Sequence, residues 1–323
     1  KAMAAAQAVA EAAEAAKRAK IQQNFREVIN PENAARRNIL KPKQWSTIVY
    51  PKGLQKEQYQ PQIEATTSEQ QLWSTFKCLF PWEWGQSDVV DDDADTETIH
   101  NIYVDTNTKI SVLHVDTVTA AMDLLKTAGG EKVFILNFAN AHNRGGGYEG
   151  GAFAQEEDIC RRTNLFKRLQ DVKYPWPSED DVVYCSNVEV FRDGKLKMLT
   201  DIHLIDVITA AAPYQPLVYT FLKKDENDQR EHEKQFLFAR QDQRERVAEK
   251  LRSVLRTALQ NGARIGVLGA WGCGVYGGPP HDNAKLWSKV LQENEFAGQF
   301  KTLVFAVLGD NFNIFKKHIH PQS

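Results

Sequence analysis

VFILNFANAHNRGGG, residues 133–147, is the stretch of sequence that decides the predicted fold. Its first four residues, 133–136, form a short apolar run that is typical of a strand buried on both faces. Three glycines follow at 145–147. In open α/β sheets, ligands bind beyond the carboxyl ends of the strands, where glycines let backbone N–H groups approach the ligand closely. The stretch therefore predicts a central strand that leads into a ligand-binding loop.

A second glycine-rich loop, GAWGCGVYGG at residues 269–278, also follows a buried apolar run, 265–268. Consecutive N–H groups that converge in such a loop form a cradle for an anion such as phosphate. Neither loop is a P-loop, because no Gly-Lys-Ser/Thr follows the glycines, and neither matches the GxGxxG dinucleotide fingerprint. On these residues alone, phosphate-binding loops and simple tight turns are equally good interpretations.

The sequence Gln155-Glu156-Glu157 follows the first glycine loop after seven intervening residues. If a helix begins near residue 153, the two carboxylates lie in its first turn and face the glycines. Neighbouring carboxylates raise each other's pKa, and a carboxylic acid poised near neutrality can protonate a glycosidic oxygen. Acidic residues in a first turn also simply complement the helix dipole. The pattern therefore predicts either a general acid or a helix-stabilising pair.

The remaining sequence alternates between strand-like and helix-like segments. Further strands are predicted at 102–104, 110–113, 182–184, 188–191, 203–211, 265–268 and 302–308, and helices at 118–127, 153–170, 226–260 (one or two) and 286–291. Such alternation, with short buried β runs, predicts an α/β fold with a mixed, partly parallel central sheet.

The first hundred residues differ in character from the rest. Residues 4–20 read as a polar, Ala-rich helix, and prolines interrupt the loop-like stretch 31–86. An acidic run at 88–97 then reads as a solvated linker. We therefore predict an N-terminal helical or irregular extension over 1–97 and a separate α/β domain over 98–323.

Composition restricts the possible partners. Lys and Arg number 40 and Asp and Glu 42, so the chain is nearly neutral, at −2, and we expect no direct nucleic-acid binding and no attraction to anionic membranes. No stretch is long and apolar enough to predict a membrane span or a secretory signal. The four cysteines include no CxxC pair, which favours reduced thiols, a cytoplasmic location and no metal site. We expect a monomer.

The glycines 145–147, seven residues and then Gln155-Glu156-Glu157 resemble the GGG-x(6–8)-QEE signature of microbial-type poly(ADP-ribose) glycohydrolases. The strings VITAAAP (207–213), LGAWGCGVYGGPP (268–280) and LVFAVLGDNFNIF (303–315) are similar to that family as well, and the resemblance covers residues 102–318. It implies a macrodomain-like three-layer α/β/α fold over 98–323, with a mixed central sheet. It also implies that the partner is ADP-ribose or an ADP-ribosylated protein, and that no cofactor or metal is needed.

The resemblance also implies roles for individual residues. Glu157 would be the catalytic acid, and Glu156 beside it would fix substrate hydroxyls together with Gln155. The other substrate-binding positions are Asp116 at the adenine amino group, Asn140 and Gly145, Gly146 and Gly147 around the ribose, Gly272, Cys273, Gly274 and Val275 at the diphosphate, and Tyr276 on the terminal ribose. Tyr276 stands where the family more often has Phe, and Gly278 where Asn is common.

Three functions remain open from the sequence. The signature favours hydrolysis of the ribose–ribose links of poly(ADP-ribose). Removal of single ADP-ribose groups from a protein side chain such as arginine, as by a bacterial effector delivered into a host cytosol, is the second. A non-catalytic ADP-ribose reader is the third, although a pure reader has no need for the acidic pair. Arg161 and Arg162 could pair with phosphate, but their place on a predicted helix favours a solvated face.

Overall fold

The computed structural model describes residues 46–58, 108–224 and 232–319. The predicted helix at 4–20, the acidic run at 88–97 and the predicted strand at 102–104 lie outside the described residues. The same is true of the boundary that we predicted between residues 97 and 98.

The core of the molecule is a seven-stranded mixed sheet with the strand order β1-β4-β5-β3-β8-β9-β2. Strands β5, β3, β8, β9 and β2 are parallel to one another, whereas β4 pairs antiparallel with both β5 and β1. This arrangement confirms the predicted α/β fold with a mixed sheet. The strands span β1 Thr47–Tyr50, β2 Lys109–Leu113, β3 Val133–Ala139, β4 Val182–Arg192, β5 Met198–Ala211, β8 Ile265–Gly269 and β9 Thr302–Ala306.

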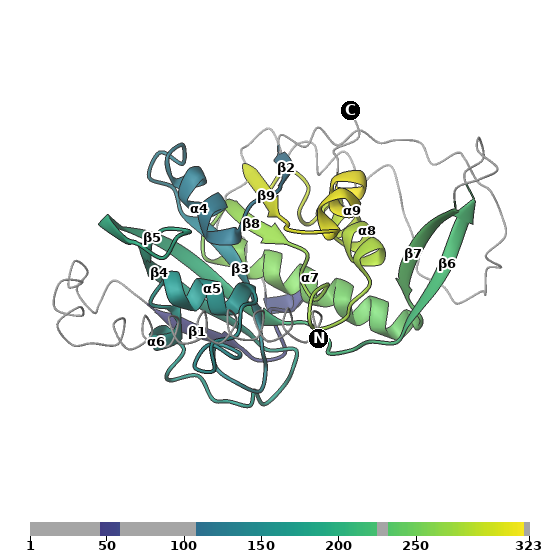
Figure 1. Ribbon diagram of the computed structural model, residues 1–323, viewed down its shortest axis with the longest axis horizontal. Coiled ribbons are helices and arrows are strands. Elements are labelled where there is room, and N and C mark those ends of the chain that lie inside the picture. Colours follow the sequence, from purple (N-terminus) through teal and green to yellow (C-terminus); the bar gives the residue numbers. More distant parts are fainter. Residues whose placement is uncertain (1–45, 59–107, 225–231, 320–323) are drawn as a thin grey trace, which may run out of the picture.

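Helices cover both faces of the sheet and make three layers (Figure 1). One face carries α4 Thr117–Leu125, α5 Gln155–Arg162 and α6 Leu165–Arg168, and the other carries α7 Gln241–Gln260, α8 Pro280–Leu291 and α9 Asn311–His318. Side chains alternate along a strand, so Phe134 packs into the core under α7 and α8 while Ile135 packs into the core under α4 and α5. The unbroken apolar run at 133–136 is therefore the central strand of a sheet with two covered faces.

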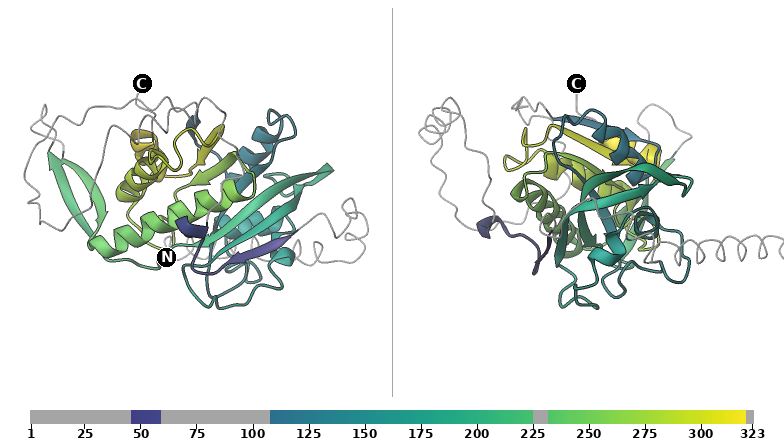
Figure 2. Two further views of the ribbon diagram at one scale, coloured as in Figure 1. Left: turned by 180° about the vertical axis from the view of Figure 1, so that it is seen from behind. Right: turned by 90° about the vertical axis from the view of Figure 1, so that its left-hand side faces the viewer.

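The predicted helix over 226–260 is wrong in its first part. Residues His232–Phe238 form strand β7, which pairs with β6, Val218–Lys224, in a hairpin that lies apart from the central sheet (Figures 1 and 2). The other edge of β7 is held by α8, because Asp282 accepts a hydrogen bond from the Phe238 N–H at 3.2 Å. These partners are distant in sequence, so the local charge pattern did not predict them.

The prediction of one helix over 153–170 is wrong only in its continuity, because the segment is broken at Thr163 into two helices, α5 and α6. Thr163 has an extended backbone and forms a bridge with Val190 of β4. The strands predicted at 182–184 and 188–191 are one strand, β4, with a change of register between Cys185 and Val188. Strands β1 and β6 and helix α9 were not predicted.

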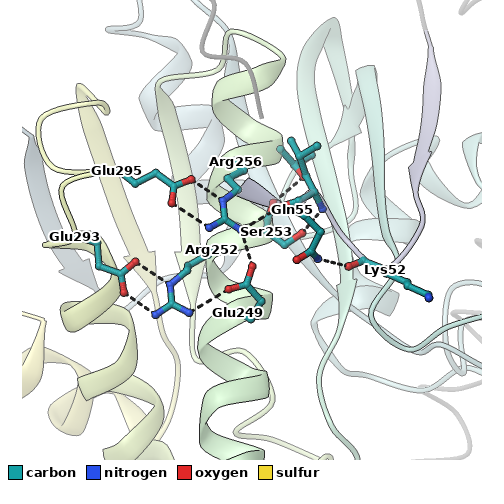
Figure 3. A network of polar contacts seen from close by, with 10 residues as sticks. Lys52, Gln55, Glu249, Arg252, Ser253, Arg256, Glu293 and Glu295 are labelled. Atoms are coloured by element: carbon teal, nitrogen blue, oxygen red, sulfur yellow. Dashed lines mark hydrogen bonds and ion pairs between the residues drawn. The ribbon is translucent and has the colours of Figure 1, made fainter. Parts of the chain in front are cut away.

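Residues 46–58 belong to the sheet domain, although the sequence placed them in the extension. Strand β1 pairs with residues 182–185 of β4. The chain then crosses to α7, where the Leu54 N–H donates to Ser253 Oγ at 2.6 Å and Arg256 donates to the Leu54 carbonyl at 3.3 Å. Figure 3 shows this network, in which the buried Arg256 also pairs with Glu249 and Glu295. This segment is thus fastened to the domain at both of its ends.

Candidate active site

A cleft of about 980 Å³ lies at the carboxyl ends of the parallel strands, where α/β sheets commonly bind ligands. Its walls are the segments that follow β2, β3, β5, β8 and β9, together with the start of α5. The predicted site residues that line it are Asp116, Asn140, Gly146, Gly147, Gln155, Glu156, Glu157, Gly272, Gly274, Val275 and Tyr276. Gly145 and Cys273 do not line the cleft; Gly145 packs against the ring of Phe166.

The first turn of α5 fixes the carboxylate of Glu157. Its Oε2 accepts a hydrogen bond from the Ala154 N–H at 3.0 Å, which caps the start of the helix. Its Oε1 accepts from the Gly147 N–H at 2.8 Å, in the glycine loop. Glu157 is therefore held against the loop by two backbone donors, although it is almost fully buried at 6% exposure.

The neighbouring carboxylate, Glu156, is held from the opposite side by strand β3. Its Oε1 accepts from the Asn137 side-chain amide at 3.1 Å, and its Oε2 accepts from the Asn140 N–H at 2.8 Å. Burial, together with the nearby charge of Glu157, raises the pKa of Glu156 to about 8 in spite of these hydrogen bonds. Glu156 therefore binds a proton at neutral pH.

The two carboxylates converge on Gly146. This residue has a positive φ of 59°, and a Cβ built on it would lie 2.5 Å from Glu157 Oε1 and 3.0 Å from Glu156 Oε2. Only a residue without a side chain fits there without displacing a carboxylate. The glycine loop thus lets the backbone close over both acids, and this close approach explains the short spacing between the glycines and the acidic pair.

Gln155 is used to position α5. Its Oε1 accepts from the Phe138 N–H at 2.9 Å, and its Nε2 donates to the Leu136 carbonyl at 2.7 Å and to Thr117 Oγ1 at 3.0 Å. These bonds tie the first residue of α5 to β3 and to α4. Gln155 lines the cleft, but its amide is already paired within the protein.

Asn137 is a site residue that the sequence reasoning missed. It is fully buried on β3, and its amide nitrogen donates to Glu156, whereas its Oδ1 has no partner among the described residues. The sequence did contain a clue, because Asn137 is a polar residue directly after the apolar run 133–136. Side chains alternate along a strand, so Asn137 points to the same face of the sheet as Ile135, which is the face that α5 covers.

The second glycine loop presents backbone donors to the cleft. Among the described residues, no acceptor is recorded for the N–H groups of Gly272, Gly274, Val275 and Tyr276. Cys273 differs, because its N–H donates to the Ala270 carbonyl at 3.1 Å and burial raises the pKa of its thiol. Such a run of unpaired donors forms an anion-binding concavity.

The cleft is also lined by Asp116, the capping residue of α4. Its two oxygens accept from the Thr119 N–H and hydroxyl, each at 2.7 Å, and it pairs with Arg162. Burial raises the pKa of Asp116, but the hydrogen bonds from Thr119 and the charge of Arg162 outweigh this effect and lower the pKa below its usual value. Asp116 is thus a carboxylate that keeps its charge.

The prediction that Arg161 and Arg162 lie on a solvated face is wrong. Both are at least 95% buried and both line the cleft. Arg162 is paired with Asp116 and Asp158, and Arg161 donates to the Ala152 carbonyl. Asp158 lies on the same helix and Ala152 just before it, whereas Asp116 comes from the start of α4, 46 positions away, so the helix pattern alone could not show how fully these charges are compensated.

A family model, the catalytic domain of microbial-type PARG (poly(ADP-ribose) glycohydrolase), matches residues 55–193. The poly(ADP-ribose) glycohydrolase of Thermomonospora curvata, bound to the inhibitor ADP-HPD, is 30% identical, and the match covers 65% of this chain and 78% of that one with a TM-score of 0.54. The chain belongs to the microbial-type poly(ADP-ribose) glycohydrolase family.

The enzyme of Deinococcus radiodurans in complex with ADP-ribose is also similar to this glycohydrolase, at 29% identity and a TM-score of 0.54, over 67% of this chain and 86% of that one. A search of curated proteins gave no match. These relatives confirm the macrodomain-like fold expected from the sequence and make the protein a glycohydrolase.

Two kinds of feature are absent from residues 46–58, 108–224 and 232–319 of this glycohydrolase, a membrane-spanning helix and a metal-binding cluster. No helix in these ranges is long and apolar enough to cross a membrane. No group of three or more His, Cys, Asp or Glu side chains in them is placed to hold a metal ion.

Replacing Glu156 by Gln is expected to change the stability of the glycohydrolase in a pH-dependent way. The pKa of Glu156 is raised in the folded state, so the unaltered fold loses stability as pH rises from about 4.5 through about 8, while a glutamine cannot ionise. Glu156→Gln should therefore gain stability relative to the unaltered chain between pH 5 and pH 8.5, on the order of 3 kcal/mol. Urea unfolding at both pH values measures this gain, with exposed Glu149→Gln as the control. A stability difference that is independent of pH would show that Glu156 does not titrate in this range.

Proposed function

We propose that this cleft hydrolyses the glycosidic bond of ADP-ribosyl groups, and that its substrate is the ribose–ribose link of poly(ADP-ribose). The observation that carries the proposal is the convergence of two buried carboxylates, Glu156 and Glu157, on the glycine loop inside a cleft lined by unpaired backbone donors. The solved relatives named above, one bound to ADP-ribose, support it.

In this proposal the nucleotide lies along the cleft. The N–H groups of Gly272, Gly274, Val275 and Tyr276, which have no acceptor among the described residues, donate hydrogen bonds to the diphosphate. Asp116 keeps its charge, and the remaining lone pair of its Oδ2 accepts the adenine amino group. The ribose that carries the scissile bond then lies beside Glu156 and Glu157.

The chemistry needs one proton and one water molecule. Burial raises the pKa of Glu156 to about 8, so the acidic pair enters the reaction with a proton on Glu156 that its neighbour can take up. Glu157 gives a proton to the leaving oxygen as the C1″–O bond breaks, and positive charge develops on the ribose. The resulting carboxylate takes a proton from water, whose oxygen attacks C1″. The nearby diphosphate stabilises the positive charge in the transition state.

Binding of ADP-ribose tests the site independently of catalysis. A ligand present at 100 times its dissociation constant adds about 2.7 kcal/mol to the free energy of unfolding. ADP-ribose should therefore raise the melting temperature more than AMP or NAD, because only ADP-ribose fills the adenine, diphosphate and ribose positions together. Thermal melts with the three ligands measure this order. No shift with millimolar ADP-ribose would remove the binding-site assignment.

A further inference from the structure

We propose that Tyr214 and Tyr276 form a subsite at the rim of the cleft that stacks on the purine base of the leaving nucleoside. The inference rests on the proposed function and deepens it, because it names the leaving group as a nucleoside of the polymer in preference to an amino-acid side chain.

Tyr276 connects the rim to the catalytic acids. It lines the cleft, and burial, with the negative charges of Glu156 and Glu157, raises the pKa of its phenol to about 12. Its hydroxyl is therefore within electrostatic reach of both carboxylates.

Tyr214 stands edge-on to Tyr276, with ring centroids 5.3 Å apart and an interplanar angle of 89°. Tyr214 is 60% exposed, so much of its ring has no cover. The Gln215 N–H donates to the Tyr276 carbonyl at 2.8 Å, and the Gln215 side chain donates to the Tyr214 hydroxyl at 3.2 Å. These bonds hold the two loops together, so the ring of Tyr214 is ordered before a ligand arrives.

The lack of charged residues at the rim favours a nucleotide base over a peptide as its ligand. Neither of the two segments that form it, 207–222 and 265–281, contains an Asp, Glu, Lys or Arg residue. A protein side chain such as an ADP-ribosylated arginine, with its polar surroundings, finds no charged partner on these segments. A purine base needs no charged partner, because stacking on an aromatic ring is favourable without charge pairing.

The ribose–ribose linkage attaches a base to the sugar that leaves. When ribose is joined to ribose, the oxygen that Glu157 protonates belongs to the sugar of an adenosine, and the base is attached to that same sugar. The base is therefore only one sugar ring away from the scissile bond, and a subsite for it has to adjoin the cleft, as the Tyr214–Tyr276 pair does. An arginine leaving group has no ring at this position.

The test measures poly(ADP-ribose) hydrolysis and product binding in the same variants. Tyr214→Ala should lower kcat/KM for poly(ADP-ribose) about tenfold, mainly through KM, because loss of one stacked base has about this effect. The inhibition constant of ADP-ribose should change far less, because the product lacks the leaving base. Tyr214→Phe should restore kcat/KM, and Met198→Ala, a similarly exposed residue at the far end of β5, is the control.

Three results would overturn the subsite. Equal losses in kcat/KM and in ADP-ribose affinity would mean that Tyr214 acts on the bound nucleotide and not on the leaving group. Unchanged kinetics in Tyr214→Ala would mean that no base stacks there. Release of ADP-ribose from arginine-modified protein but not from the polymer would also overturn it, while leaving ADP-ribosyl hydrolysis intact. Failure to cleave either substrate would instead refute the proposed function itself.

Discussion

Glu157→Gln is expected to lower turnover of poly(ADP-ribose) by about 10²–10⁴-fold, the usual contribution of general acid–base catalysis. The substitution keeps the size of the side chain but removes the proton that the leaving oxygen needs. The affinity for ADP-ribose should change little, since the unpaired donors of the second glycine loop and Asp116 lie elsewhere in the cleft. Turnover is measured by ADP-ribose release and affinity by calorimetry.

Two comparisons make this experiment specific. The glutamine amide can accept only one of the two backbone hydrogen bonds that Glu157 accepts from Gly147 and Ala154, so the melting temperature must be recorded as well. Glu149→Gln removes an exposed carboxylate from the same loop and should leave turnover unchanged. Near-normal turnover in folded Glu157→Gln would remove this residue from the mechanism and point to Glu156.

Gly146→Ala is expected to reduce turnover by about 10²-fold, because a displacement of about 1 Å in a catalytic group has an effect of this size. The new Cβ would lie 2.5 Å from Glu157 Oε1, so either the carboxylate or the loop must move. The positive φ of 59° adds strain of about 1 kcal/mol for a residue with a side chain. Steady-state kinetics and thermal melts of the same sample separate the two effects.

Gly150→Ala is the matched control in the same loop. A Cβ at Gly150 would meet only the Gly147 carbonyl oxygen, at an ordinary 3.5 Å, and its φ is not positive. It should retain nearly all activity. If both alanine variants lose activity equally, the effect comes from stiffening of the loop and not from contact with the acids.

The sequence was most informative where chemistry depends on residues close together in the chain. The acidic pair, the glycines beside it and the second glycine loop were all predicted from short contiguous patterns, and the structure brings them to one cleft. Asn137 was missed because its importance lies in one hydrogen bond to Glu156, nineteen positions away. Arg162 was misplaced partly for the same reason, since its partner Asp116 comes from a distant segment.

The wrong predictions of secondary structure also come from contacts between residues that are distant in the sequence. β7 carries a charged sequence that suits a helix, but pairing with β6 and the hydrogen bond to Asp282 of α8 make it a strand. β1 lies in a proline-interrupted stretch with weak local signals, and it is a strand because β4 offers it an edge. The monomeric state and the cytoplasmic location remain predictions.

Release of ADP-ribose is the measurement that tests the central claim most directly. The unaltered chain and Glu157→Gln are incubated with poly(ADP-ribose) and, separately, with arginine-ADP-ribosylated protein, and the products are resolved by chromatography. We predict free ADP-ribose from the polymer with the unaltered chain, and at least 10²-fold slower release with Glu157→Gln. A folded, unaltered chain that binds ADP-ribose but releases none from either substrate would contradict the claim that this cleft is a glycohydrolase active site.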